Sequence, residues 1–138
     1  MNRIHSAFYS IFRRIVLGIS RTGVPPNAVT VTGCLLQSMT GWFFYQGHWT
    51  EGALLLLLSS PLDALDGALA RQTGRGSSFG AFLDSTLDRI SDMAVFAGIL
   101  FFFTSIQNHL LAGLALYSLG SAMMISYTKA RAENLVPA

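Results

Sequence analysis

The sequence predicts an all-α fold, a bundle of four transmembrane helices. Of the 138 residues, 51% are hydrophobic and only 12% are charged, about half the charged share of an average soluble domain. The apolar residues gather in four long runs separated by short polar connections. Runs of this kind are typical of membrane-spanning helices. We expect a transmembrane domain over residues 23–138, preceded by an interfacial helix over residues 1–22.

Residues 1–22 predict an amphipathic helix that lies in the membrane interface. Arginines alternate there with Ile, Phe, Val and Leu at helical spacing, which gives one basic and one apolar face. A cleaved signal peptide would have a longer and less interrupted apolar core. Pro25 and Pro26 end this helix, because proline lacks a backbone N–H and restricts the residue before it.

The first transmembrane helix is expected over residues 28–45, with Asn27 as its N-cap. A helix of that length rises about 27 Å, close to the thickness of the hydrocarbon core. It ends in four aromatic residues, 42–45, which are typical of the aromatic belt at a membrane surface.

The other helices follow from where the apolar runs stop. The run over residues 52–62 is too short to cross a membrane, so we expect the second helix to continue to about Arg71. Residues 72–78 have the composition of a loop. The third helix is expected from about Phe79 to Phe103, and the fourth over residues 110–132, where small residues permit close packing.

The basic residues predict the orientation. All nine lysines and arginines lie before the first apolar run, around the connection between the second and third runs, or after the fourth run. The connections at 46–51 and 104–109 contain none. The positive-inside rule therefore places the N-terminus, the central connection and the C-terminal basic pair on the cytoplasmic side of the plasma membrane.

Four aspartates stand at paired helical spacings around the central connection. Asp63 and Asp66 are three residues apart, and Asp84 and Asp88 are four apart, so each pair shares one face of its helix. Uncompensated carboxylates in a membrane are costly, and several close together repel one another. Hard oxygen ligands from two helices suit a pair of Mg²⁺ or Mn²⁺ ions.

Alternative interpretations of single residues remain open. Membrane aspartates also serve as hydrogen-bonding groups between helices or as a path for protons or cations. Asp92 lies three residues after Arg89, an ordinary salt-bridge spacing. Cys34 is the one cysteine of the chain and is interpreted as a small core residue.

The carboxylates belong to a longer pattern. The string D-x2-D-G-x2-A-R-x8-G-x3-D-x3-D resembles the signature of the CDP-alcohol phosphotransferase family, and the segment 26–30 resembles the start of that family's first transmembrane helix. The pattern is filled in this chain by Asp63, Asp66, Gly67, Ala70, Arg71, Gly80, Asp84 and Asp88. The resemblance implies transfer of a substituted phosphate from a CDP-linked lipid, typically CDP-diacylglycerol, to an alcohol, with release of CMP.

The resemblance also implies roles for individual residues. Asp63, Asp66, Asp84 and Asp88 would ligate the metals, and Asp88 would also act as the general base on the acceptor hydroxyl. The residues implied in binding of the CDP-lipid are Asn27, Ala28, Val29, Thr30, Gly67, Arg71 and Ser77.

The end of the fourth helix resembles an acceptor site. The stretch from Ser126 to Glu133 is similar to a motif of phosphatidylinositol phosphate synthases, in which Ser126, Lys129 and Arg131 would help to bind the phosphate of inositol phosphate. Phosphatidylglycerol phosphate synthases carry related versions, so the expected acceptor is a phosphorylated polyol such as inositol phosphate or glycerol 3-phosphate. The two basic residues equally fit a positively charged cytoplasmic helix end.

Members of the resembled family commonly have about six transmembrane helices, so two are expected to be missing here, and a homodimer is expected. Two other functions stay open. The carboxylates would also suit a divalent-cation transporter or another ion-translocating bundle, although a transporter would spread its charges through the membrane depth. An inactive fragment with a structural role is the third possibility.

Overall fold

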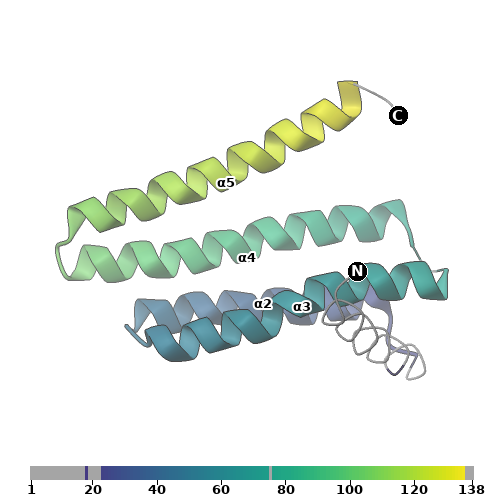
Figure 1. Ribbon diagram of the computed structural model, residues 1–138, viewed down its shortest axis with the longest axis horizontal. Coiled ribbons are helices and arrows are strands. Elements are labelled where there is room, and N and C mark those ends of the chain that lie inside the picture. The colour runs from purple at the N-terminus through teal and green to yellow at the C-terminus, as the bar shows by residue number, and fades with distance from the viewer. Residues whose placement is uncertain (1–17, 19–22, 75, 136–138) are drawn as a thin grey trace, which may run out of the picture.

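The computed structural model describes residues 18, 23–74 and 76–135, apart from the side chains at positions 62–64, 66, 71–73 and 134. The regular structure in these residues is entirely helical, which confirms the all-α prediction. Four long helices follow one another, joined by short connections (Figure 1). They are α2 (Pro26–Tyr45), α3 (Trp49–Thr73), α4 (Ser78–Ser105) and α5 (His109–Leu135). The predicted interfacial helix, residues 1–22, lies outside the described residues except for position 18.

Helix α2 is the centre of the packing. It contacts both α3 and α4, while α5 packs against α4. Figure 1 shows α5 beside α4 at the α4–α5 connection and diverging from it toward the C-terminal end. The consequence is that α3 and α4 each pack on α2, and α5 is attached through α4.

The backbones of α2 and α4 touch where the helices cross. A Cβ added to Gly41 would collide with the carbonyl oxygen of Ala94, and one added to Gly98 would collide with the carbonyl of Gly41. Small residues let helix backbones approach this closely, which is characteristic of packing between membrane helices. Ser91 and Val95 extend the same buried face of α4.

Aromatic rings close the end of the bundle at the α2–α3 and α4–α5 connections. Trp49 stacks on Phe44 at a centroid distance of 5.3 Å and meets Phe102 edge-on at 4.9 Å. Phe44 is buried, whereas Trp42 and Tyr45 are exposed. The aromatic segment predicted as a membrane belt is therefore divided between a core contact and an outer surface.

The helix boundaries lie close to those predicted, but the predicted N-cap of α2 is wrong. Helix α2 begins at Pro26 with Pro25 as N-cap and no side-chain capping bond, so the prediction that Asn27 caps this helix is wrong. Proline suits the first helical position, because its φ is already helical and its missing N–H would have had no partner there. Asn27 instead lies in the first turn.

The connection between α3 and α4 shows two recognisable signals. Gly74 takes the left-handed conformation (φ 63°), and its N–H bonds the carbonyl of Ala70, which ends α3. The hydroxyl of Ser77 accepts a hydrogen bond of 2.9 Å from the N–H of Gly80 and so caps α4. Both residues fall within the predicted loop.

Among the described residues, α5 is the one helix that meets both the length and the hydropathy expected of a membrane span. Its segment His109–Glu133 is long and apolar enough to cross a bilayer, with a mean hydropathy of 1.5. Helices α2, α3 and α4 have 20, 25 and 28 residues, or about 30 to 42 Å at 1.5 Å per residue. Their length therefore suffices for crossing, and crossing by these three stays a prediction.

Candidate functional site

A cavity of about 280 Å³ lies at the end of the bundle where α2 and α4 begin and α3 ends. Its described lining comes from three helices and the α3–α4 connection, with no contribution from α5. The lining residues are Pro26, Asn27, Thr30, Gly67, Ala70, Gly76, Ser77, Gly80, Ala81 and Asp84. Five of the predicted site residues, far apart in the sequence, are thus brought together: Asn27, Thr30, Gly67, Ser77 and Asp84.

The first turns of α2 and α4 meet at Gly80. A Cβ placed on Gly80 would lie 3.2 Å from the hydroxyl oxygen of Ser77 and 3.3 Å from Oδ1 of Asn27. Both distances are tighter than ordinary contacts, so a larger residue would displace these two polar groups. This crowding gives a physical reason for glycine at the corresponding point of the sequence pattern.

The two helix N-termini at this end of the bundle favour an anion, whereas Asp84 in the same lining is acidic. Asn27 lies in the first turn of α2 and Ser77 caps α4, so two helix N-termini border the cavity. Helix N-termini carry partial positive charge and backbone N–H groups without helical partners. Such ends are common binding positions for phosphate groups.

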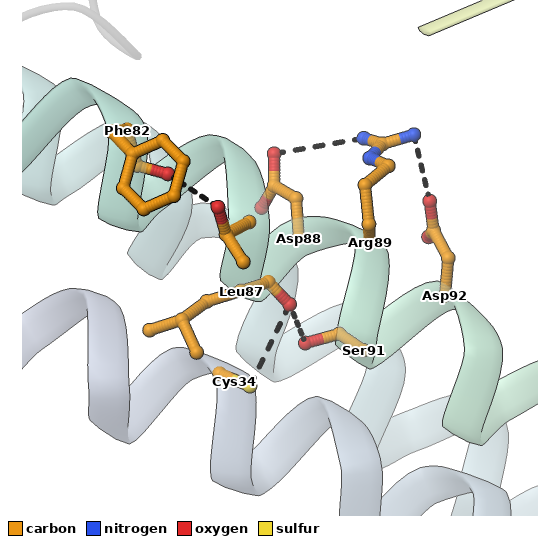
Figure 2. Close-up of polar contacts among 8 residues, drawn as sticks. Cys34, Phe82, Leu87, Asp88, Arg89, Ser91 and Asp92 are labelled. Carbon is orange, nitrogen blue, oxygen red and sulfur yellow. Dashed lines mark hydrogen bonds and ion pairs between the residues drawn. The ribbon is translucent and has the colours of Figure 1, made fainter. Parts of the chain in front are cut away.

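The aspartates of α4 lie on one face, one turn apart. Asp84 lines the cavity, and Asp88 follows four residues later with 36% of its side chain exposed. Figure 2 shows Asp88 and Asp92 on either side of Arg89, whose guanidinium lies 3.7 Å from Asp88 Oδ2 and 3.1 Å from Asp92 Oδ2. The predicted ion pair between Arg89 and Asp92 is confirmed.

Beneath Asp88 a polar contact joins α2 to α4. The carbonyl of Leu87 accepts hydrogen bonds from the hydroxyl of Ser91, at 3.0 Å, and from the thiol of Cys34, at 3.6 Å (Figure 2). Cys34 is half-buried between the helices. Cys34 was predicted as a small core residue, but it is only partly buried, and its thiol crosses to the turn that carries Asp88.

Helix α3 supplies the third wall. Gly67 and Ala70 line the cavity, while Leu65 and Leu69 are buried. Asp63, Asp66 and Arg71 belong to this helix, but their side chains lie outside the described part of the chain. Among the residues that are described, no group of three or more His, Cys, Asp or Glu side chains forms a metal site. The four-aspartate metal centre therefore stays a prediction.

The predicted acceptor residues lie apart from the cavity. Ser126 is half-buried, while Lys129 and Arg131 are exposed on α5. Lys129 pairs with Glu133 at 4.0 Å, and both side chains are more than two-thirds exposed. The described chain therefore does not bring these residues into the cavity.

Some site residues agree less closely with the sequence predictions. Ala28 is exposed and Val29 half-buried, and neither lines the cavity. Conversely, Gly76 and Ala81 line it without having been predicted. The glycine-rich composition of the loop and the position of Ala81 next to Gly80 were the available signals.

Comparison with known proteins gives a consistent result. The family model for CDP-alcohol phosphatidyltransferase matches residues 24–136. The phosphatidylinositol phosphate synthase of Streptomyces avermitilis is 36% identical over 138 residues, which are 98% of this chain and 57% of that protein. The archaetidylinositol phosphate synthase of Pyrococcus horikoshii is 34% identical over 133 residues, which are 96% of this chain and 68% of that protein.

Solved structures agree with the sequence comparison. A crystal structure of the Mycobacterium tuberculosis phosphatidylinositol phosphate synthase with CDP-DAG bound is similar with a TM-score of 0.82 and 38% identity, over 91% of this chain and 64% of that one. The same enzyme in complex with manganese and citrate gives a TM-score of 0.81 and 38% identity, over 89% and 60%. The chain thus spans about three-fifths of the length of these relatives.

Proposed function

Because the chain belongs to the CDP-alcohol phosphatidyltransferase family, we propose that it is an integral membrane transferase of phospholipid biosynthesis. It moves a phosphatidyl group from CDP-diacylglycerol or a similar CDP-lipid to an alcohol and releases CMP. One observation carries the proposal: residues assigned to the CDP-lipid and to the metals from sequence, among them Asn27, Ser77 and Asp84, line one cavity. A relative with the same fold has been solved with CDP-DAG bound.

The residues at the cavity fit a divalent metal. Asp84 and Asp88 offer carboxylate oxygens from adjacent turns of one helix face. Positions 63 and 66 stand four residues before Gly67 and Ala70, the two cavity-lining positions of α3, and so share their register. We propose that the four aspartates hold a pair of Mg²⁺ or Mn²⁺ ions, oxygen-binding cations. When bound, such ions offset the diphosphate charge and polarise its phosphorus.

The chain's own residues bind the donor and accept the proton of the acceptor. The N-terminal turns of α2 and α4, with Asn27 and Ser77, bind the CDP portion at the cavity, and Gly67 lets the donor approach the α3 backbone closely. Arg71 meets a phosphate of the donor. Asp88 takes the proton of the acceptor hydroxyl while the hydroxyl oxygen of the acceptor bonds to the lipid-bearing phosphorus. The bond from that phosphorus to the bridging oxygen breaks, and CMP leaves with the electron pair.

We propose a phosphorylated polyol as the acceptor, with Ser126, Lys129 and Arg131 binding its phosphate. The relatives named as phosphatidylinositol phosphate synthase and archaetidylinositol phosphate synthase support this choice, and basic side chains suit a phosphate group. These residues lie at the same end of the bundle as the cavity, on the helix that diverges from α4 (Figure 1). The acceptor therefore approaches from the α5 side while the donor occupies the cavity.

The membrane placement completes the proposal. Every lysine and arginine belongs to the cavity-side half of its helix, to the α3–α4 connection or to residues 1–22, which supports a cytoplasmic active site in the plasma membrane. The proposed organisation is an interfacial helix over residues 1–22, a transmembrane domain over 23–138 and a homodimer.

The proposal is tested by measuring CMP release from CDP-diacylglycerol in proteoliposomes. The assay contains Mn²⁺ or Mg²⁺ and, in turn, inositol phosphate, glycerol 3-phosphate or free inositol. We expect release that depends on the metal and on a phosphorylated acceptor, and loss of release in Asp88→Asn. No CMP with any acceptor, or unchanged release by Asp88→Asn, would contradict the proposed function. Flux of Mn²⁺ into the same vesicles without CMP release would favour ion translocation instead.

A further inference from the structure

Arg89 has an arrangement that a simple surface ion pair does not explain. Its two terminal nitrogens are divided between two carboxylates: Nη1 lies 3.1 Å from Asp92 Oδ2, and Nη2 lies 3.7 Å from Asp88 Oδ2 (Figure 2). The first is a charge-assisted contact at hydrogen-bonding distance, and the second is a looser ion pair. The guanidinium is therefore anchored on Asp92 and presents its other nitrogen to Asp88.

The burial of Arg89 also distinguishes it from a simple surface ion pair. The side chains of Arg89, Asp88 and Asp92 are 34%, 36% and 28% exposed, so all three are held partly within the protein. The Nε–H of Arg89 is buried and makes no hydrogen bond within the described residues. A buried unpaired donor is unfavourable. A lysine would supply a positive charge here without an Nε–H, so balancing of charge alone does not explain an arginine.

We propose that Arg89 is a positioning residue for Asp88. Anchored by Asp92, its planar guanidinium holds one carboxylate oxygen of Asp88 and so fixes the orientation of the group that takes the acceptor proton. This inference rests on the proposed function, because it assigns Arg89 and Asp92 to the support of the general base. Groups that orient a reacting side chain typically matter through geometry, and an arginine fork fixes geometry better than an ammonium group.

The experiment compares variants in the CMP-release assay with CDP-diacylglycerol, Mn²⁺ and inositol phosphate. Arg89→Gln is expected to lower kcat about 10- to 100-fold, the range for loss of an orienting partner. The KM for CDP-diacylglycerol is expected to stay within about threefold, because the donor is bound elsewhere. Asp92→Asn should lower kcat in the same direction, since it removes the anchor and keeps the side-chain shape.

Two further variants distinguish a positioning role of Arg89 from an effect of its charge alone. Arg89→Lys keeps the positive charge but has one nitrogen for two carboxylates, so we expect it to recover little of the lost kcat. The double variant Arg89→Gln/Asp92→Asn should be no slower than Arg89→Gln alone, because the two residues act as a unit. Full recovery by lysine, or additive losses in the double variant, would overturn the proposal.

Folding and metal binding are measured on the same samples. Thermal unfolding in detergent and Mn²⁺ binding followed by electron paramagnetic resonance are expected to stay close to wild type. Tighter Mn²⁺ binding with faster turnover in Arg89→Gln would show competition with the metal and contradict positioning. If Arg89→Gln does not fold, the shape-conserving Asp92→Asn decides: kcat within about twofold of wild type would overturn the inference.

The control is Glu51→Gln, at the other end of the bundle, which removes an exposed carboxylate that lies 3.7 Å from the His48 imidazole at the same three-residue spacing. It should leave kcat unchanged. If wild type releases CMP and Asp88→Asn does not, while Arg89→Gln and Asp92→Asn keep wild-type kcat, the positioning role fails and the proposed function stands. If wild type releases no CMP, both fall.

Discussion

Gly98 of α4 lies directly against the backbone carbonyl of Gly41 of α2, with no room for a side chain between them. This contact holds together the two helices whose N-terminal ends border the cavity. The separation of α2 and α4 at this crossing is therefore set by direct backbone contact.

We predict that Gly98→Ala destabilises the protein. The added methyl group must push the α2 backbone aside, and overpacking of this kind costs about 1–3 kcal/mol. A lower unfolding temperature in detergent would report the effect. Gly113→Ala is the matched control, because a Cβ on Gly113 of α5 meets nothing within 4 Å. Equal unfolding temperatures for the two variants would contradict the close crossing.

Gly80→Ala should weaken use of the CDP-lipid more than it weakens the fold. Its Cβ would crowd the side chains of Asn27 and Ser77 at 3.3 and 3.2 Å, both at the cavity wall. We expect the KM for CDP-diacylglycerol to rise about 3- to 10-fold, or about 1 kcal/mol of binding, with an unfolding temperature near wild type. Gly120→Ala, in open space on α5, should leave KM unchanged. A normal KM in Gly80→Ala would argue that the donor does not bind beside Asn27.

Removal of metal should abolish turnover. A chelator is expected to stop CMP release and added Mn²⁺ or Mg²⁺ to restore it, because carboxylates are the ligands these ions prefer. Asp84→Asn, which removes a carboxylate from the cavity wall, should lower kcat at least about 100-fold and weaken Mn²⁺ binding in a direct titration. Turnover that persists in chelator would exclude the metal-dependent mechanism.

Lys129→Ala should affect the acceptor alone. Loss of one charge-assisted contact to a phosphate removes about 1.5–3 kcal/mol of binding free energy. The KM for inositol phosphate is therefore expected to rise at least about tenfold, while the KM for CDP-diacylglycerol stays the same. Glu133→Gln removes the partner of Lys129 in its ion pair and keeps the lysine, so it serves as the control. An equal rise in KM for both substrates would instead indicate that Lys129 belongs to a basic helix end and serves only to set the membrane orientation.

Much of the fold could be predicted because the chain carries strong local signals. Pro25 and Pro26 mark the start of α2, and the glycine-rich stretch around Gly74 marks the break between α3 and α4. Such residues act through their own backbone geometry and need no tertiary context. Even there, the capping role of Asn27 was predicted wrongly, because proline can open a helix without a side-chain cap.

The packing could not be predicted in the same way. Gly41 and Gly98 are separated by more than fifty residues, and nothing local in either segment identifies the other as its partner. The divergence of α5 from α4 is likewise a tertiary property (Figure 1). The aspartate pattern, by contrast, indicated a site because its residue types carry their chemistry wherever the helices place them; of these, the structure places Asp84 at the cavity.

The described wall of the cavity belongs to α2, α3, α4 and one connection, with no part from α5. Donor recognition and acceptor recognition, as proposed, therefore reside in separable parts of the chain. The proposal therefore predicts that changes in α5 alter which alcohol is accepted without disturbing the pocket for the activated lipid. This division makes α5 the segment to exchange between members of the family when acceptor choice is to be altered.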